Sequence, residues 1–437
     1  MRHLGLLIAI LLLTPAAFAE RTLLVTLDGA PLAEPSGAAS PKERQAVVDQ
    51  WIAALRRHKV PALLFAAGRD LPGSQALMRR WVQAGLEVGT LGQQVTLRPE
   101  LPIDPWKQNL LAGQTGLAAA LADLGSKQKT VRWYRFPDLV EGASLDAQLA
   151  AKDAVAKAKM QVVDATIDTP SAAIDEAWAA AKRAKNKVLT AELAQDWLAA
   201  MRAIVGRSES VAEKLGIGDA PQVLRLPLTA LGASNADAFF AWLERRGYKF
   251  AAAEDVMRHP LFLKTHSYTG RRGVSLLWRL RISKDLENAD KTIKAKLASA
   301  ADAWSHGDLD GFMSAFADDL RFVSGRTIIE GKVNLRDAYR RRYKTPAAMG
   351  TLKLDVQRLD IHTSERETLF GLVEPVPPRY GIAAVKWTLD PQGAPGREGY
   401  ATLVLLKTSA GWRIFEDHST TGSIFAKPKP RPKPKPR

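Results

Sequence analysis

The feature that most constrains the fold is the alternation of short apolar runs with longer helical patterns between residues 21 and 256. Short runs rich in leucine and β-branched residues are typical of strands, and apolar residues spaced by three and four are typical of helices. The clearest helical face follows the helix-start pair Ser40-Pro41 and consists of Val47, Val48, Trp51, Ile52 and Leu55. Strands separated by helices favour a parallel sheet, and about seven such repeats predict a barrel closed on itself.

The individual elements follow from the same periodicities. Predicted strands cover residues 23–27, 60–67, 86–91, 131–136, 161–165 and 223–226. After the helix that follows Ser40, predicted helices cover residues 75–84, 110–124, 145–159, 172–184 and 191–204. In barrels of this kind the functional side chains lie in the loops at the carboxyl ends of the strands. Polar residues at those ends are therefore the candidates for a site.

The first nineteen residues have the features of a secretory signal peptide. Arg2 and His3 are a short positive region, residues 4–13 are apolar, and Ala17-Phe18-Ala19 is a small-x-small cleavage site before Glu20. Ten apolar residues are short of the roughly 20 that span a bilayer as a helix. We expect a mature chain that starts near Glu20 and is periplasmic or secreted, with an uncleaved signal anchor as the alternative.

The absence of cysteine limits the chemistry available to this chain. It excludes disulfides, a thiolate metal site and a cysteine nucleophile, so any metal must be held by histidine, aspartate and glutamate. Three histidines in the first half are interpreted as surface or hydrogen-bonded residues rather than ligands: His58, His259 and His266.

The chain ends in a basic, proline-rich segment. The formal net charge is +16, and the last eleven residues contribute six of the positive charges in an alternation of Lys or Arg with Pro. Such an alternation forms neither helix nor sheet. Residues 423–437 are predicted to be a disordered tail that suits an anionic polymer or a membrane surface, or that simply solubilises the chain. Nucleic acid is not expected as a partner of an exported protein.

The end of the first predicted strand carries the most specific motif, Thr26-Leu27-Asp28-Gly29-Ala30-Pro31. It resembles the opening Thr-Phe-Asp-Asp-Gly-Pro of the polysaccharide deacetylase (NodB-homology) family. That family has a distorted (β/α) barrel, in which a divalent metal held by one aspartate and two histidines activates water to remove acetyl groups from sugars. The resemblance spans roughly residues 20–282 and implies that Asp28 is in the position of the general base. Gly29 is in the position of the ligating aspartate and offers no ligand.

The other motifs of the resemblance also lack ligands. Leu91 and Val95 are in the positions of the family's histidine pair. The segment 132–137 resembles the groove motif, with Arg135 retained next to Asp28 and Asp138 in place of a tyrosine. No histidine lies between residues 221 and 258, where the family has its general acid. The resemblance therefore implies a fold that is retained and a metal site that is lost.

Two functions are compatible with these residues. In the favoured one, the chain is a non-catalytic factor that binds glycan or the cell envelope without a cofactor; Asp28 and Arg135 are vestigial, and Asp138 and Asp168 contact the polysaccharide. In the alternative, it is a divergent hydrolase that removes acetyl groups from a polysaccharide, with a divalent metal at a site built on Asp28, Arg135 and Asp168.

A second domain follows a charged stretch at residues 283–288, which is interpreted as the linker. An amphipathic helix is predicted from Ile293, Leu297, Ala300, Ala301 and Trp304. Asp308 is a helix cap, and Ser409-Ala410-Gly411 between two apolar runs is a hairpin turn.

Residues 289–422 resemble the SnoaL-like, nuclear transport factor 2-like family, chiefly in segments 303–310 and 411–420. The resemblance implies an α+β cone, in which helices pack into a curved antiparallel sheet around a pocket, and makes a homodimer through this domain plausible. Asp417 and His418 are candidates for a general base with an orienting carboxylate, which would make the cone the active part. The favoured interpretation is structural for this pair, and Trp304 is assigned to the core or the pocket lining.

Overall fold

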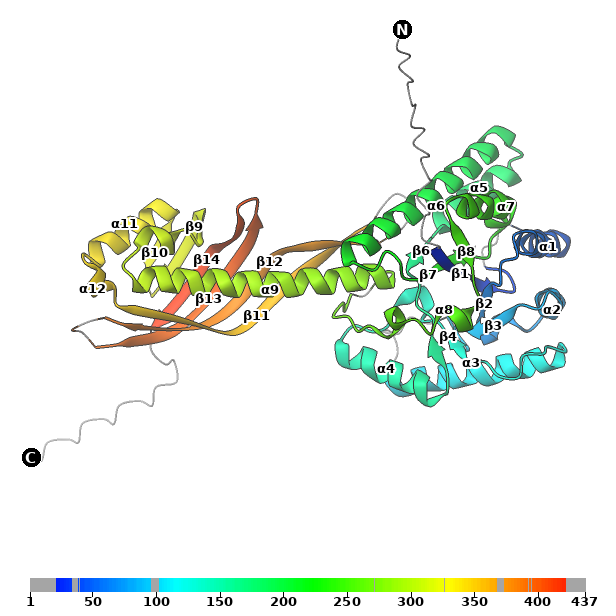
Figure 1. Ribbon diagram of the computed structural model, residues 1–437, viewed down its shortest axis with the longest axis horizontal. Coiled ribbons are helices and arrows are strands. Elements are labelled where there is room, and N and C mark those ends of the chain that lie inside the picture. Colours follow the sequence, from blue (N-terminus) through cyan, green and yellow to red (C-terminus); the bar gives the residue numbers. More distant parts are fainter. Residues whose placement is uncertain are drawn as a thin grey trace, which may run out of the picture. The chain divides into compact units, whose positions relative to one another are not determined.

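The computed structural model describes residues 21–33, 38, 40–95, 102–270, 272–325, 327–367, 373–391, 393 and 395–421. The chain forms two compact units (Figure 1). The first consists of the residues up to Arg281 together with Glu367–Glu374, and the second consists of Ile282–Arg366 and the residues from Pro375 on. The predicted signal peptide and basic tail lie outside the described residues. Within the described parts, no helix combines the length and apolarity needed to cross a membrane.

The first unit alternates strands and helices, as the sequence predicts. Its elements are β1 (Arg21–Ala30), α1 (Pro41–Arg57), β2 (Leu63–Ala66), η1 (Gly68–Asp70), α2 (Gln75–Gln83), β3 (Glu87–Thr90), α3 (Ile103–Asp123), β4 (Trp133–Tyr134), η3 (Pro137–Leu139), α4 (Leu145–Lys157), β5 (Gln161–Val162), β6 (Ile167–Asp168), α5 (Ala172–Arg183), α6 (Lys187–Leu215), β7 (Gln222–Pro227), α7 (Ala230–Arg245), β8 (Tyr248–Phe250), α8 (Ala253–Val256) and η4 (Pro260–Leu263).

The strands of this unit form one parallel sheet. Its order is β5-β4-β3-β2-β1-β7-β6, with β8 also paired to β1. The α/β class is thus confirmed, but the sheet is a curled half-barrel and not the closed barrel that we expected. Strands β5 and β6 at the two ends of the path have two residues each and do not pair with each other in the described sheet. Strands this short offer few ladder hydrogen bonds with which to close a barrel.

Helix α1 illustrates why the elements of the first unit form where they do. Ser40 and Glu43 form a reciprocal capping box at its start, with Pro41 in the first turn. The five apolar residues that the periodicity places on one face are all buried. The indole nitrogen of Trp51 on that face donates to the backbone oxygen of Thr229, at 3.1 Å, which ties α1 to the start of α7.

The second unit is an α+β domain with one curved sheet. Its elements are α9 (Leu276–Ser305), which begins in the first unit, α10 (Leu309–Met313), β9 (Phe316–Ser324), β10 (Thr327–Glu330), α11 (Lys332–Arg342), α12 (Pro346–Met349), β11 (Thr351–Glu367), β12 (Val373–Asp390), β13 (Arg397–Thr408) and β14 (Gly411–Thr421). The sheet order is β10-β9-β14-β13-β12-β11.

Two expectations for this half need correction. The sheet is mixed and not antiparallel, because β14 pairs with β9 in parallel while β13 and β14 form the predicted hairpin. Parallel pairing is possible because a long crossover separates β9 from β14. Residues 283–288, predicted as a linker, lie inside α9, so the connection is helical. Within this segment Lys284 and Glu287 are exposed and Asp285 is half-buried, whereas Ile282, Ala289 and Ile293 on the same helix are buried.

Candidate functional site

Asp28 lies where the carboxyl ends of three strands meet. In the sheet register it is opposite Phe65 of β2 and Pro227 of β7. Gly29 follows with a φ of +90°, and a Cβ atom at this position would lie 2.8 Å from the Cβ atom of Ala33. Gly29 therefore offers no metal ligand, and the backbone around it leaves no room for a side chain that could supply one.

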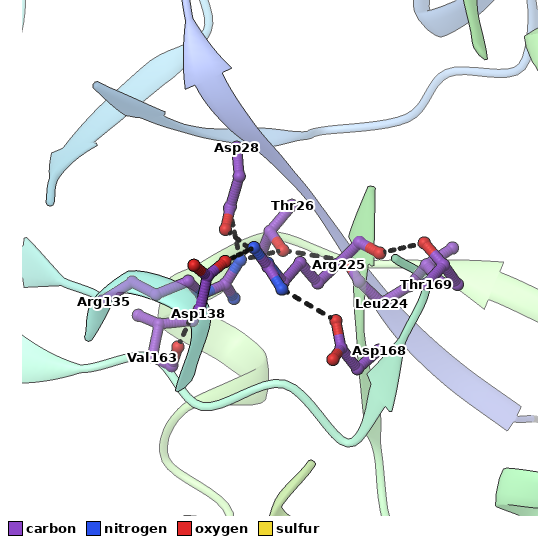
Figure 2. A network of polar contacts seen from close by, with 9 residues as sticks. All are labelled: Thr26, Asp28, Arg135, Asp138, Val163, Asp168, Thr169, Leu224 and Arg225. Atoms are coloured by element: carbon purple, nitrogen blue, oxygen red, sulfur yellow. Dashed lines mark hydrogen bonds and ion pairs between the residues drawn. The ribbon is translucent and has the colours of Figure 1, made fainter. Parts of the chain in front are cut away.

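Arg135 approaches Asp28 from the loop after β4 and is fully buried. Its Nη1 atom donates to Asp28 Oδ1 and to Thr26 Oγ1, both at 2.6 Å, as Figure 2 shows. Its Nη2 atom has no hydrogen-bond partner, and the guanidinium carbon lies 4.4 Å from the ring centroid of Phe65, so a cation–π contact supplies part of the missing stabilisation. Burial lowers the pKa of Arg135, and the attraction of Asp28 opposes that shift.

Arg225 on β7 is the residue that sequence reasoning missed. Its Nε atom donates to Asp28 Oδ2 at 2.7 Å, and its Nη1 and Nη2 atoms donate to Asp168 and Asp138, each at 3.0 Å (Figure 2). Its backbone oxygen accepts a hydrogen bond from the hydroxyl of Thr169. Burial would lower the pKa of Arg225, but the three carboxylates outweigh burial and raise the pKa well above its ordinary value.

The structure thus brings together all four residues that the sequence selected in the first unit: Asp28, Arg135, Asp138 and Asp168. It does so around a guanidinium that the sequence analysis did not consider. The sequence does contain an indication of this role, because a charged residue between Leu224 and Leu226 is unusual in an otherwise apolar strand.

The donor set does not fit the divalent metal that the deacetylase resemblance implies. Leu91 is buried in an apolar cluster, and Val95 is partly exposed. The three carboxylates at the barrel mouth are each bonded to the same guanidinium. In the described ranges no group of three or more His, Asp or Glu side chains is placed to hold a metal ion. The side chains at this site therefore do not fit metal-dependent hydrolysis.

The three histidines of the first unit are engaged elsewhere. His58 lies 3.0 Å from Glu244, and His266 lies 3.0 Å from Glu141. His259 Nδ1 accepts from the backbone of Leu261 at the start of η4. These contacts agree with the interpretation of hydrogen-bonded histidines.

The second unit contains a cavity of about 460 Å³ inside the cone. Trp304 from α9 and Asp417 from β14 line it, with a largely apolar and aromatic wall. The indole nitrogen of Trp304 donates to the backbone oxygen of Met349 at 2.9 Å, so this ring is fixed as part of the wall.

Asp417 and His418 do not act as a pair in this geometry. Successive residues of a strand point to opposite faces. Asp417 is buried in the cavity wall and accepts from Ser419 Oγ at 2.6 Å, whereas His418 is exposed and lies 3.0 Å from Glu416. Burial raises the pKa of Asp417 to about 6. Only the carboxyl group therefore reaches the cavity.

Comparison with solved structures gives similar folds for each unit. A CE4 family pseudoenzyme from Bacillus anthracis is 16% identical over 55% of this chain and 66% of its own, with a TM-score of 0.38. The peptidoglycan deacetylase PdaC from Bacillus subtilis is 15% identical over 55% of this chain and 91% of its own, with a TM-score of 0.35. An NTF-2-like protein of unknown function from Shewanella oneidensis MR-1 is 22% identical over 30% and 98%, with a TM-score of 0.25.

Neither a protein-family model nor a curated protein matches the chain. The described topology of the two units, a curled parallel α/β half-barrel and a curved-sheet α+β domain, agrees with the two resemblances seen in the sequence. At identities of 22% or less and TM-scores below 0.5, the likeness to these solved structures supports no statement about function.

Proposed function

We propose that the first unit is a non-catalytic, polysaccharide deacetylase-like module that binds a glycan of the cell envelope. One observation carries this proposal. The carboxylate in the position of the general base, that of Asp28, has both oxygens bonded to cations, Oδ1 to Arg135 and Oδ2 to Arg225.

The arrangement argues against hydrolysis for a chemical reason. A general base must lie within hydrogen-bond reach of the water from which it takes a proton. Here each oxygen of Asp28 already accepts a charge-assisted hydrogen bond from an arginine, so a water at either oxygen would have to share that oxygen with a guanidinium. Positions 29, 91 and 95 offer no side-chain donor to a metal that would activate that water. We therefore infer that the first unit binds a glycan at the carboxyl ends of these strands without hydrolysing it.

Asp138 supports a binding role for the same mouth. Its side chain is 66% exposed, although one oxygen accepts from Arg225. Exposed carboxylate oxygens accept hydrogen bonds from the hydroxyl groups of sugars, and the carboxyl ends of the strands are where ligands bind in folds of this type. Asp168 accepts a hydrogen bond from another nitrogen of the same Arg225 guanidinium (Figure 2).

Two assays on the purified mature chain test the proposal. We expect retention on an insoluble acetylated glycan, such as chitin or peptidoglycan, and no release of acetate with or without added Zn²⁺ or Co²⁺. The Asp138→Ala variant should bind more weakly, while Asp123→Ala, an exposed carboxylate at the end of α3, should bind like the parent. Acetate release that depends on Asp28 would establish the hydrolase alternative, and binding unaffected by Asp138→Ala would remove the mouth from the proposal.

Export to the periplasm or the exterior is a further part of the proposal, supported by the signal-like residues 1–19. Mass spectrometry of the protein from its native host should then find a chain that begins near Glu20.

The basic tail is proposed to hold the chain at an anionic surface, and deletion of residues 423–437 should then weaken binding to anionic vesicles. A homodimer through the cone is tested by the concentration dependence of the mass in solution.

A further inference from the structure

Two arginines at the cavity of the second unit share one aromatic neighbour. Arg342, the last residue of α11, and Arg397, the first of β13, both line the cavity. The guanidinium of Arg397 donates to the hydroxyl of Tyr343 at 3.2 Å, and that of Arg342 lies 5.7 Å from the Tyr343 ring centroid. Two cations are thereby brought to the same part of the cavity wall.

Neither arginine has a carboxylate partner among the residues that the structure describes. Nearby cations do have such partners. Arg336 and Arg340 on α11 both lie within 4 Å of Asp310, and Lys386 on β12 is paired with Glu398 of β13. Asp417, the acidic residue of the cavity wall, is bonded to Ser419 and to neither arginine. Arg342 and Arg397 are thus the basic residues of the cavity lining, and neither is paired with a carboxylate of the described residues.

Such an arrangement has an electrostatic cost that an anion would remove. Two neighbouring like charges repel each other, and they repel more strongly where the surroundings exclude water. Arg397 is half-buried, so part of its surroundings is protein. Guanidinium groups match the planar geometry of a carboxylate, which can accept hydrogen bonds from both.

The interior of the cavity indicates the rest of the ligand. Its wall includes Trp304, Phe312, Phe316, Trp387 and Leu403. A volume of about 460 Å³ lies within the range of roughly 300–1,000 Å³ that is common for small-molecule sites. The indole nitrogen of Trp387 is buried without a hydrogen-bond partner, so a ligand oxygen could accept from it.

We propose that this cavity binds a small amphipathic carboxylic acid, whose apolar ring system fills the interior and whose carboxylate is held by Arg342 and Arg397. This site is separate from the glycan-binding mouth of the first unit. The proposal does not depend on the function proposed for that unit.

A matched pair of ligands tests the charge recognition directly. Titration calorimetry of the full mature chain with naphthoate and with its neutral methyl ester should show one-to-one binding, with the acid bound at least about tenfold more tightly. The double variant Arg342→Gln/Arg397→Gln should weaken acid binding by about tenfold or more and leave the ester within about twofold. The control Arg358→Gln, which removes an exposed arginine paired with Asp360, should change neither affinity.

A variant that fills the cavity separates binding inside it from binding elsewhere. Ala338 lines the cavity, and Ala338→Trp should abolish binding of both ligands while circular dichroism stays native. Equal binding of acid and ester, an equal loss of both in the double arginine variant, or the absence of acid binding would each overturn the proposal. So would acid binding that persists in the folded Ala338→Trp variant.

Discussion

Replacement of Arg225 by methionine is expected to destabilise the first unit by about 3–5 kcal/mol, the cost of leaving a buried carboxylate without its partner. The structure indicates which carboxylate carries that cost. Asp28 keeps its bond to Arg135, and the side chain of Asp138 is 66% exposed. Asp168 has a side chain that is only 10% exposed, and Arg225 is its sole side-chain partner among the described residues.

A second substitution should recover much of the loss. In the Arg225→Met background, Asp168→Asn removes the uncompensated charge, so the double variant should be more stable than Arg225→Met alone, with a coupling energy of about 1–3 kcal/mol. Asp138→Asn in the parent chain should cost no more than about 1 kcal/mol, because an exposed ion pair contributes little. Arg258→Met, at an exposed arginine paired with Glu254, is the matched control and should also cost under about 1 kcal/mol.

Hydrogen exchange followed by mass spectrometry is the suitable assay, because a chain of two units has no single unfolding transition. Peptides from β1, β7 and α7 report on the first unit, and peptides from β13 and β14 report on the second. We expect the loss of protection in Arg225→Met to be confined to the first group. A loss below about 1 kcal/mol in that group, or the absence of recovery on adding Asp168→Asn, would refute the reasoning that Arg225 balances the buried charge.

Three further predictions concern positions whose environment is well defined. Gly29→Ala should destabilise the first unit by about 1–3 kcal/mol, measured by hydrogen exchange in first-unit peptides, because the φ of Gly29 is +90° and the new Cβ would meet Ala33. Burial raises the pKa of Asp175 to about 6, so its neutral form is stabilised; this contribution is present below about pH 4 and lost as pH rises through 6. In the parent, the stability reported by first-unit peptides should decline by on the order of 3 kcal/mol between about pH 4 and pH 7. In Asp175→Asn this decline should be absent. Asp417, whose pKa is also about 6, should give the same pH dependence in second-unit peptides, and Asp417→Asn should remove it.

The long elements were predictable because their apolar residues repeat over several turns. Val47, Val48, Trp51, Ile52 and Leu55 fall on one face of a helix whatever surrounds it, and all five are buried. Whether the sheet closes into a barrel was not predictable in the same way. It depends on pairing between strands as short as β5 and β6, in which two residues carry no periodicity.

The candidate site likewise contains residues that a local motif identifies and a residue that only long-range strand pairing places there. A motif at one point in the chain identifies Asp28 and Arg135, and the structure places them in contact. Arg225 lies 197 residues from Asp28, and only the register of β1 against β7 brings the two side chains together. The separation of Asp417 from His418, by contrast, was available from the sequence, because adjacent residues of a strand face opposite sides.

The absence of metal ligands and the presence of Arg225 are linked by charge. Three carboxylates from the ends of different strands repel one another unless a cation lies among them. In this chain the cation is a covalently attached guanidinium, which donates one hydrogen bond to each carboxylate. Reintroducing an aspartate at Gly29 alone would add a fourth negative charge next to Ala33 while the guanidinium still occupied its partners. A working metal site would therefore require the removal of Arg225 and new donors at 91 and 95, so single reversions should restore neither metal binding nor hydrolysis.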